Sequence, residues 1–163
     1  MKDELVKIDF EISPEIIITD RICRVYGSEI QYLGHSHNLY EIFFVTNGKC
    51  NFFAQNSFYT LNENDIILIS PNQIHSITYP DSLHEHVFVN FSDYYINPEI
   101  SHELLYMMGA GKYTPSPEDI DFFKNAFNEL KNSPHSNTNY KARTKFVSLL
   151  LRIPKAYLCT LTM

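Results

Sequence analysis

The chain has 163 residues, of which 44% are hydrophobic and 20% charged, and it has no low-complexity tract. This composition predicts one ordinary folded domain and excludes a disordered chain. The net charge is −6: residues 1–129 carry 7 basic and 19 acidic side chains (−12), and residues 130–163 carry +6. The acidic part would repel a phosphate backbone, so direct nucleic-acid binding by this part is excluded.

The first ten residues carry five charged side chains and have no apolar segment of the kind found in a secretory signal. No apolar run approaches the roughly 20 residues of a membrane helix. The three cysteines are far apart and form no C-x-x-C motif, which argues against both a disulfide framework and a thiolate metal cluster. We therefore expect a cytoplasmic protein without a membrane partner.

The part of the chain before Pro98 consists of short apolar runs separated by Asn, Gly, Pro and Ser. The runs are IIITD, RVYG, YEIFFVT, CNFFA, DIILIS, HSITY and EHVFVNF. Runs of this length at intervals of eight to twelve residues are typical of a β-sandwich or β-barrel. We predict a mainly β fold, with a barrel over residues 1–97.

One pair of runs predicts a hairpin, because Asn47-Gly48 between YEIFFVT and KCNFFA is a strong signal for a two-residue type I′ turn. That turn would pair Val45 with Cys50 and Phe43 with Phe52. Since strand side chains alternate, one face would carry Glu41, Phe43, Val45, Cys50, Phe52 and Ala54. Ile42, Phe44 and Phe53 would form the second apolar face, covered by helices or by another subunit.

Residues 98–163 have helical patterns. Asn97-Pro98 can open a first helix that Gly109 would close. Ser116-Pro117-Glu118-Asp119 is a helix start with a capping residue, and an apolar stripe follows it at three- and four-residue steps. A third helix is predicted from about residue 138 to Ile153, with Pro154 disfavouring its continuation.

The apolar residues of the third helix extend nearly all round it, which implies burial on more than one side. Packing within the chain and a dimer seam both satisfy this pattern. The sequence favours the seam, so we predict a homodimer held by the helical tail, with contacts from Phe146, Leu149, Leu150 and Ile153.

The odd-numbered face of the predicted hairpin continues backwards to His37 and His35, so that the segment reads H-x-H-x3-E-x6-G, ending at Gly48. A proline turn after DIILIS leads to His75 at the start of another strand. Three imidazoles and the Glu41 carboxylate suit a first-row divalent metal. The same four side chains could instead form a polar pocket for an organic ligand. His84 and His86 have no carboxylate at a matching offset, and we interpret them as surface or rim residues.

These motifs resemble those of the cupin superfamily, a double-stranded β-helix or jelly-roll barrel. The segment His37-Asn-Leu-Tyr-Glu41, the Asn-Gly turn and LNENDIILISPNQIH, which ends at His75, resemble the N-terminal effector-binding domain of AraC-type transcription regulators. The order of a barrel followed by helices agrees. In that family the barrel senses a small molecule, often a sugar, and the helices support dimerisation.

The resemblance implies a ligand-sensing and dimerisation domain that reaches DNA only through a separate C-terminal domain. Nine residues follow Pro154, too few for a helix-turn-helix, so we expect no DNA-binding domain in this chain. The expected ligand is a small polar effector held without a cofactor. Its predicted contacts are His35, His37, Glu41, His75, Phe43, Phe52 and Tyr79.

The alternative is a metal-dependent cupin enzyme, an oxygenase or isomerase, with one divalent transition metal on His35, His37, Glu41 and His75. Two departures from the metal-binding cupin pattern weigh against it. Glu29 and Gln73 stand where those proteins usually have glycine, and the second motif is one residue short. Metal distances tolerate only about ±0.2 Å, so such a shift can move His75 out of range.

Overall fold

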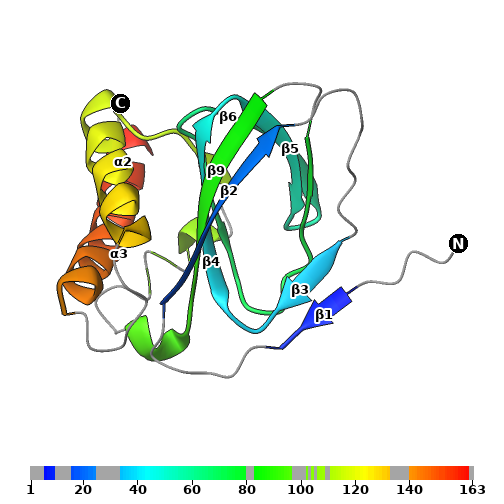
Figure 1. Ribbon diagram of the computed structural model, residues 1–163, viewed down its shortest axis with the longest axis horizontal. Coiled ribbons are helices and arrows are strands. Elements are labelled where there is room, and N and C mark those ends of the chain that lie inside the picture. Colours follow the sequence, from blue (N-terminus) through cyan, green and yellow to red (C-terminus); the bar gives the residue numbers. More distant parts are fainter. Residues whose placement is uncertain are drawn as a thin grey trace, which may run out of the picture.

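The computed structural model describes residues 6–9, 16–24, 34–79, 83–96, 102, 104, 106–108, 111–132 and 140–161 (Figure 1). Its strands are β1 (Val6–Ile8), β2 (Ile16–Arg24), β3 (His35–His37), β4 (Tyr40–Asn47), β5 (Lys49–Ala54), β6 (Ser57–Asn62), β7 (Ile66–Ile69), β8 (Ser76–Thr78), β9 (Leu83–Phe91) and β10 (Lys112–Tyr113). Its helices are the 3₁₀ turn η1 (Asp93–Tyr95), α2 (Pro117–Lys131) and α3 (Tyr140–Leu161).

The strands form two facing sheets with the helices packed on one side, as Figure 1 shows. The larger sheet has the order β10-β7-β4-β9-β2 and the smaller one β6-β5-β8, while β1 pairs in parallel with β3. The prediction of a mainly β, cupin-like barrel followed by helices is confirmed. The larger sheet also takes a strand, β10, from beyond residue 97, so the barrel extends past the boundary expected from the sequence.

The predicted hairpin between β4 and β5 is wrong. Strand β4 pairs with β7 and β9, and β5 pairs with β6 and β8, so the chain crosses from one sheet to the other at Asn47-Gly48. Gly48 has φ +75°, and a Cβ there would lie 2.2 Å from the Leu83 carbonyl oxygen, which explains the glycine. A two-residue turn with both φ values positive instead joins β5 to β6 at Gln55-Asn56 (55° and 58°).

Helix α2 begins as predicted, since the Ser116 hydroxyl accepts a hydrogen bond from the Asp119 backbone N–H. Residues 102, 104 and 106–108 are helical, while Asn97, Pro98 and Gly109 lie outside the described residues. The predicted end of the last helix is wrong, because α3 continues through Pro154 to Leu161. Pro154 is buried, and this packing offsets the lost backbone hydrogen bond. No helix in the described part is long and apolar enough to cross a membrane.

Two separate cores lie on the two faces of the larger sheet. The inner core fills the barrel between the sheets, and its fully buried members include Phe43, Val45, Cys50 and Phe52. The outer core lies between the sheet and the helices and includes Ile42 and Phe44. The predicted division of these side chains between two faces is therefore correct, although the predicted strand pairing is wrong. It is correct because side chains continue to alternate where the chain crosses from one sheet to the other.

The apolar side of α3 packs against the barrel of its own chain. Phe146, Leu149, Leu150 and Ile153 are each 0% exposed and belong to the outer core. The Phe146 ring contacts Phe91 and Tyr95 at centroid distances of 5.1 Å each. These four side chains are thus core residues, and the prediction that they form a dimer seam is wrong; the width of the apolar stripe reflects burial between sheet and α2.

Candidate functional site

Four predicted site residues meet at one end of the barrel. His37, Glu41 and His75 are buried, with 3%, 5% and 1% exposure, and His35 is half-buried. The His37 Nε2 and Glu41 Oε2 atoms are 3.1 Å apart, and the His75 Nε2 and Glu41 Oε2 atoms are 3.9 Å apart. The structure therefore brings together the residues that strand parity placed on one face. We call His35, His37, Glu41 and His75 the histidine–glutamate cluster.

His75 reaches the cluster through an isolated antiparallel bridge to His35. Two backbone hydrogen bonds of 2.9 Å link these residues in both directions. The turn before the bridge is closed by the Gln73 side chain, which accepts a hydrogen bond from the Ser70 N–H, and by Asn72 with φ +63°. Gln73 thus replaces the glycine of the metal-binding pattern with a side chain that stabilises the turn.

The backbone determines which nitrogen of two rings carries a proton. The Nδ1 atoms of His37 and His75 lie 3.0 and 2.9 Å from the carbonyl oxygens of Leu39 and Gln73. A carbonyl only accepts hydrogen bonds, so both Nδ1 atoms must be protonated. The Nε2 atom of His75, 3.9 Å from Glu41 Oε2, is then available to accept a hydrogen bond or to bind a metal, whereas His37 Nε2 makes a hydrogen bond with Glu41 Oε2 at 3.1 Å.

His75 is held in the neutral form. Burial lowers the pKa of His75, and this outweighs the Glu41 charge and the hydrogen bond to Gln73, which act in the opposite direction. Its Nε2 atom has no hydrogen-bond partner within the described part of the chain. A buried lone pair therefore faces the cluster without a donor.

Asn90 is a site residue that the sequence analysis missed. It lies opposite Glu41 in the β4–β9 register, is 5% exposed, and its Oδ1 atom has no partner among the described groups. Residues opposite one another on paired strands share a face, so Asn90 lies on the barrel side with Glu41. Only the register between β4 and β9 identifies Asn90 as a neighbour of Glu41, and the sequence does not reveal this register.

The three predicted apolar contacts are all buried inside the barrel, but only one of them borders the cluster. Phe52 stacks on His75, with ring centroids 6.1 Å apart and planes 7° apart. Phe43 packs on Phe52 at 4.9 Å and is one ring further from the cluster. Tyr79 lies 5.0 Å from His84, and thus beside a second pair of histidines.

That second pair corrects the interpretation of His84 and His86 as surface residues. They are 0% and 1% exposed, and His84 Nε2 lies 2.9 Å from His86 Nδ1. His86 stacks on Phe43 at 4.4 Å, so a series of rings connects the pair to Phe52 and the cluster. Burial lowers the pKa of His84 to about 4, which keeps this imidazole neutral.

The donor types in the cluster suit a divalent metal, and three of its nitrogens lie close to one another. One nitrogen from each of His35, His37 and His75 lies within 4.8 Å of the other two. Two nitrogens about 2.1 Å from one ion are at most about 4.2 Å apart, so this grouping is of the size that a single ion requires. The carbonyl-bound Nδ1 atoms provide the outer support that metal-binding histidines usually have.

The fold and the site define this chain as a cupin-like barrel with a polar cluster in its interior and helices on its outer face. The chain belongs to the family of AraC-like ligand-binding domains, whose sequence model matches residues 24–109. It is therefore a ligand-binding domain of the transcription-regulator type. No curated protein sequence matches it.

Solved structures of ToxT from Vibrio cholerae share the fold. An apo form matches 91% of this chain with a TM-score of 0.61 at 12% identity. The wild-type protein bound to an unsaturated fatty acid matches 90% with a TM-score of 0.56 at 12% identity. A form bound to (E)-4-(8-methylnaphthalen-1-yl)but-3-enoic acid matches 87% with a TM-score of 0.56 at 17% identity. The chain spans 59%, 56% and 56% of these three chains, respectively.

Proposed function

We propose that this chain is the sensor of an AraC-type regulator and binds a small polar effector at the histidine–glutamate cluster without chemical conversion. The observation that carries this proposal is that two buried acceptors, His75 Nε2 and Asn90 Oδ1, have no donor among the described residues. His75 Nε2 lies 3.9 Å from Glu41 Oε2, and Asn90 lies opposite Glu41 in the β4–β9 register. A buried acceptor left unpaired costs about 1–3 kcal/mol, which a ligand hydroxyl would recover. The effector should therefore present several hydroxyl or N–H donors, as a sugar does.

The test is calorimetric titration of the chain with a panel of pentoses, hexoses and short polyols. His37→Ala and Glu41→Ala should each weaken binding of any active compound at least about tenfold, because each removes a charge-assisted or buried hydrogen bond. His102→Ala, at an exposed helical position, is the matched control and should bind normally. Binding of an unsaturated fatty acid, with no polyol binding, would contradict the polar effector.

A metal-dependent cupin enzyme is the second candidate, and the observation in its favour is the grouping of three histidines beside a carboxylate. One nitrogen from each of His35, His37 and His75 lies within 4.8 Å of the other two. His35, His37, His75 and Glu41 would hold the ion, which would supply Lewis-acid or oxygen-activating chemistry. Elemental analysis of untagged protein distinguishes the candidates: one transition metal per chain, lost in both His37→Ala and Glu41→Ala, would favour the enzyme.

We also propose that the regulator acts in the cytoplasm as a homodimer and reaches DNA through a further domain. The described tail carries exposed apolar side chains outside the core, among them Tyr106 (58%) and Leu151 (41%). A seam would use such residues rather than the buried side of α3. Sedimentation should give a dimer at micromolar concentration that Leu151→Lys weakens; a monomer would contradict this proposal.

A further inference from the structure

The turn that carries His75 connects the histidine–glutamate cluster with the helical tail. It begins at Ser70, directly after β7. The Gln73 N–H donates to the Ser70 carbonyl oxygen at 3.1 Å, and the Ser70 N–H donates to Gln73 Oε1 at 2.9 Å. The His75 ring donates from Nδ1 to the Gln73 carbonyl oxygen at 2.9 Å. Ser70 and the His75 ring thus belong to one hydrogen-bonded unit, and we call residues 70–75 the His75 turn.

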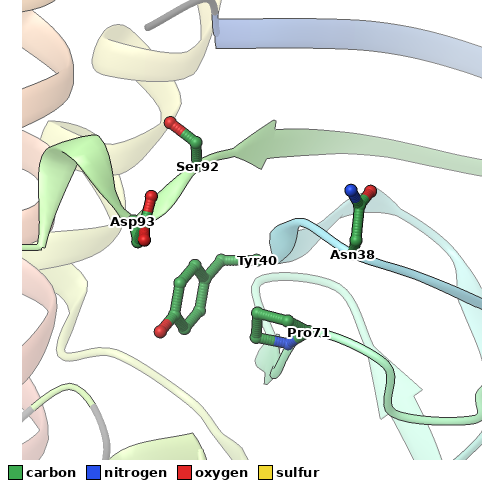
Figure 2. Close-up of a pocket in the computed structure, with 5 residues that line it drawn as sticks. All are labelled: Asn38, Tyr40, Pro71, Ser92 and Asp93. Atoms are coloured by element: carbon green, nitrogen blue, oxygen red, sulfur yellow. The ribbon is translucent and has the colours of Figure 1, made fainter. Parts of the chain in front are cut away.

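The His75 turn also contacts the chain segment that carries the rest of the cluster. The Asn72 N–H donates to the His37 carbonyl oxygen at 2.6 Å. Pro71 borders the same small hollow as Tyr40, the residue before Glu41 (Figure 2). A ligand that shifts His37, Glu41 or His75 therefore acts on this turn, because the turn is bonded to two of them and packed beside the third.

The turn reaches the helical tail at Met108, the last helical residue before β10 in the described part of the chain. The Ser70 hydroxyl donates to Met108 Sδ at 3.3 Å, and the Gln55 side-chain amide donates to the Met108 carbonyl oxygen. The same amide lies 3.5 Å from the Leu68 carbonyl oxygen on β7, and the Tyr59 hydroxyl donates to Gln55 Oε1 at 3.2 Å. Met108 is 4% exposed and belongs to the outer core, which includes the apolar sides of α2 and α3. Gln55 and Ser70 thus hold the tail to the strand that leads into the His75 turn.

The tail is held more strongly at the other end of β7. Strand β10 pairs with β7 there, the Lys112 ammonium lies 2.7 Å from Asp65 Oδ2, and the Thr114 hydroxyl donates to the same buried carboxylate. Hydrogen bonds to a charged group are roughly twice as strong as neutral ones, and a thioether sulfur is a weak acceptor. The contact between Ser70 and Met108 is therefore the one that yields first when the His75 turn shifts.

We propose that Ser70 and Gln55 couple the histidine–glutamate cluster to the helical tail through Met108. A ligand that donates a hydrogen bond to His75 Nε2 shifts this ring, and the hydrogen-bonded turn carries the shift to Ser70 and its contact with Met108. The proposal rests on the sensor function proposed above and adds the route by which the occupied barrel acts on the helices. Coupling is reciprocal, so a change at Met108 alters the cluster by the same factor.

Amide hydrogen exchange measured by NMR tests this coupling in the full chain without a ligand. Glu41→Gln keeps the shape of the side chain and removes the charge that faces His37 and His75. We expect it to change the exchange rate of the Met108 amide at least about fivefold relative to the Phe123 amide on α2, since coupled sites typically differ by 5–150-fold. Because a loss of global stability speeds both amides alike, this ratio reports the local effect.

The same substitution in variant backgrounds shows whether the two contacts carry the effect. Ser70→Ala loses the hydroxyl, and Gln55→Glu loses both donated hydrogen bonds while keeping its shape; in either background Glu41→Gln should leave the ratio unchanged. Ser70→Thr keeps a hydroxyl and should restore the response of the wild type. Ser148→Ala, which removes a hydroxyl that donates to the Thr144 carbonyl oxygen on α3, is the matched control and should respond as the wild type does.

The proposal is overturned if Glu41→Gln leaves the exchange ratio unchanged in the otherwise wild-type chain. It is also overturned if the response has the same size in the Ser70→Ala and Gln55→Glu backgrounds. No effector is present in this experiment, so its failure leaves the proposed sensor function standing. Conversely, a lack of polyol binding in the calorimetric titration would contradict the polar effector, and the exchange ratio would still measure the coupling.

Discussion

The buried pair His84–His86 predicts that the domain loses stability in mild acid. His84 has its pKa lowered to about 4, against 6.5 for an ordinary histidine, chiefly because burial penalises the charged ring. In the unfolded chain the ring takes up a proton near pH 6.5, and in the folded chain it does not. The stabilising contribution of the neutral ring is therefore complete above about pH 6.5 and is lost as the pH falls toward 4.

The magnitude follows from the two pKa values. A folded-state pKa of about 4 against 6.5 corresponds to about 3.4 kcal/mol once the pH is well below 4. Between pH 7 and pH 5 the same linkage gives a loss of about 2 kcal/mol. The fully buried position of His84 means that solvent screens little of this effect. His75, whose pKa burial also lowers, adds to the loss in the same direction.

Urea unfolding followed by circular dichroism at pH 7, 6 and 5 measures this loss, with His84→Gln as the variant. Glutamine keeps a donor for His86 Nδ1 but cannot titrate, so its stability should fall by about 2 kcal/mol less than that of the wild type over this range. His102→Gln, at an exposed position, should follow the wild type. Parallel pH profiles for wild type and His84→Gln would refute the reasoning.

Three other substitutions test the fold and the cluster. Ser116→Ala removes the α2 cap and should lower the free energy of unfolding in urea by about 1 kcal/mol, whereas Ser116→Asn keeps a capping side chain and should be as stable as the wild type. Equal stability of all three proteins would contradict the role of Ser116 as a cap. Leu150→Ala leaves a cavity at a fully buried position and should lower the free energy of unfolding by about 2–5 kcal/mol, without changing the sedimentation coefficient of the folded protein. A change in oligomeric state would instead indicate that Leu150 lies in a subunit interface. Asn90→Leu removes an unpaired buried acceptor and should raise the unfolding free energy by about 1 kcal/mol while it weakens polyol binding; a less stable variant would mean that Asn90 has a partner in the fold.

Strand alternation was sufficient to predict three of the four residues of the histidine–glutamate cluster. His35, His37 and Glu41 share a face because they lie at two- and four-residue steps along nearly continuous strand, whatever strands pair with them. Their contact with His75 depends on the turn between β7 and His75, whose length can be read from the sequence. The same local reasoning failed for the partner of β4, since an Asn-Gly step can close a hairpin or turn a corner between sheets, and only long-range pairing decides which.

Non-local pairing also explains the missed residues. In the segment HEHVFVNF both sides carry apolar and polar side chains, and nothing within it tells which side faces the barrel. Pairing with β4 decides this: His86 lies opposite Val45 and Asn90 opposite Glu41, so the polar set points inward. Similarly, Pro154 is a local signal for a helix end, and burial of α3 against the sheet overrides it.

The polar interior of the barrel has a consequence for ligand selectivity. His75 Nε2 and Asn90 Oδ1 lie buried without a donor in the described part of the chain, and the neighbouring inner core consists of apolar side chains. A ligand that donates to both recovers the cost of both, whereas an analogue lacking one hydroxyl leaves that acceptor unpaired and dry. Sites built to hydrogen-bond a hydroxyl reject the analogue without it far more strongly than apolar pockets reject a missing methylene. Selectivity at this cluster should therefore depend on the position of hydroxyl groups more than on the size of the carbon skeleton.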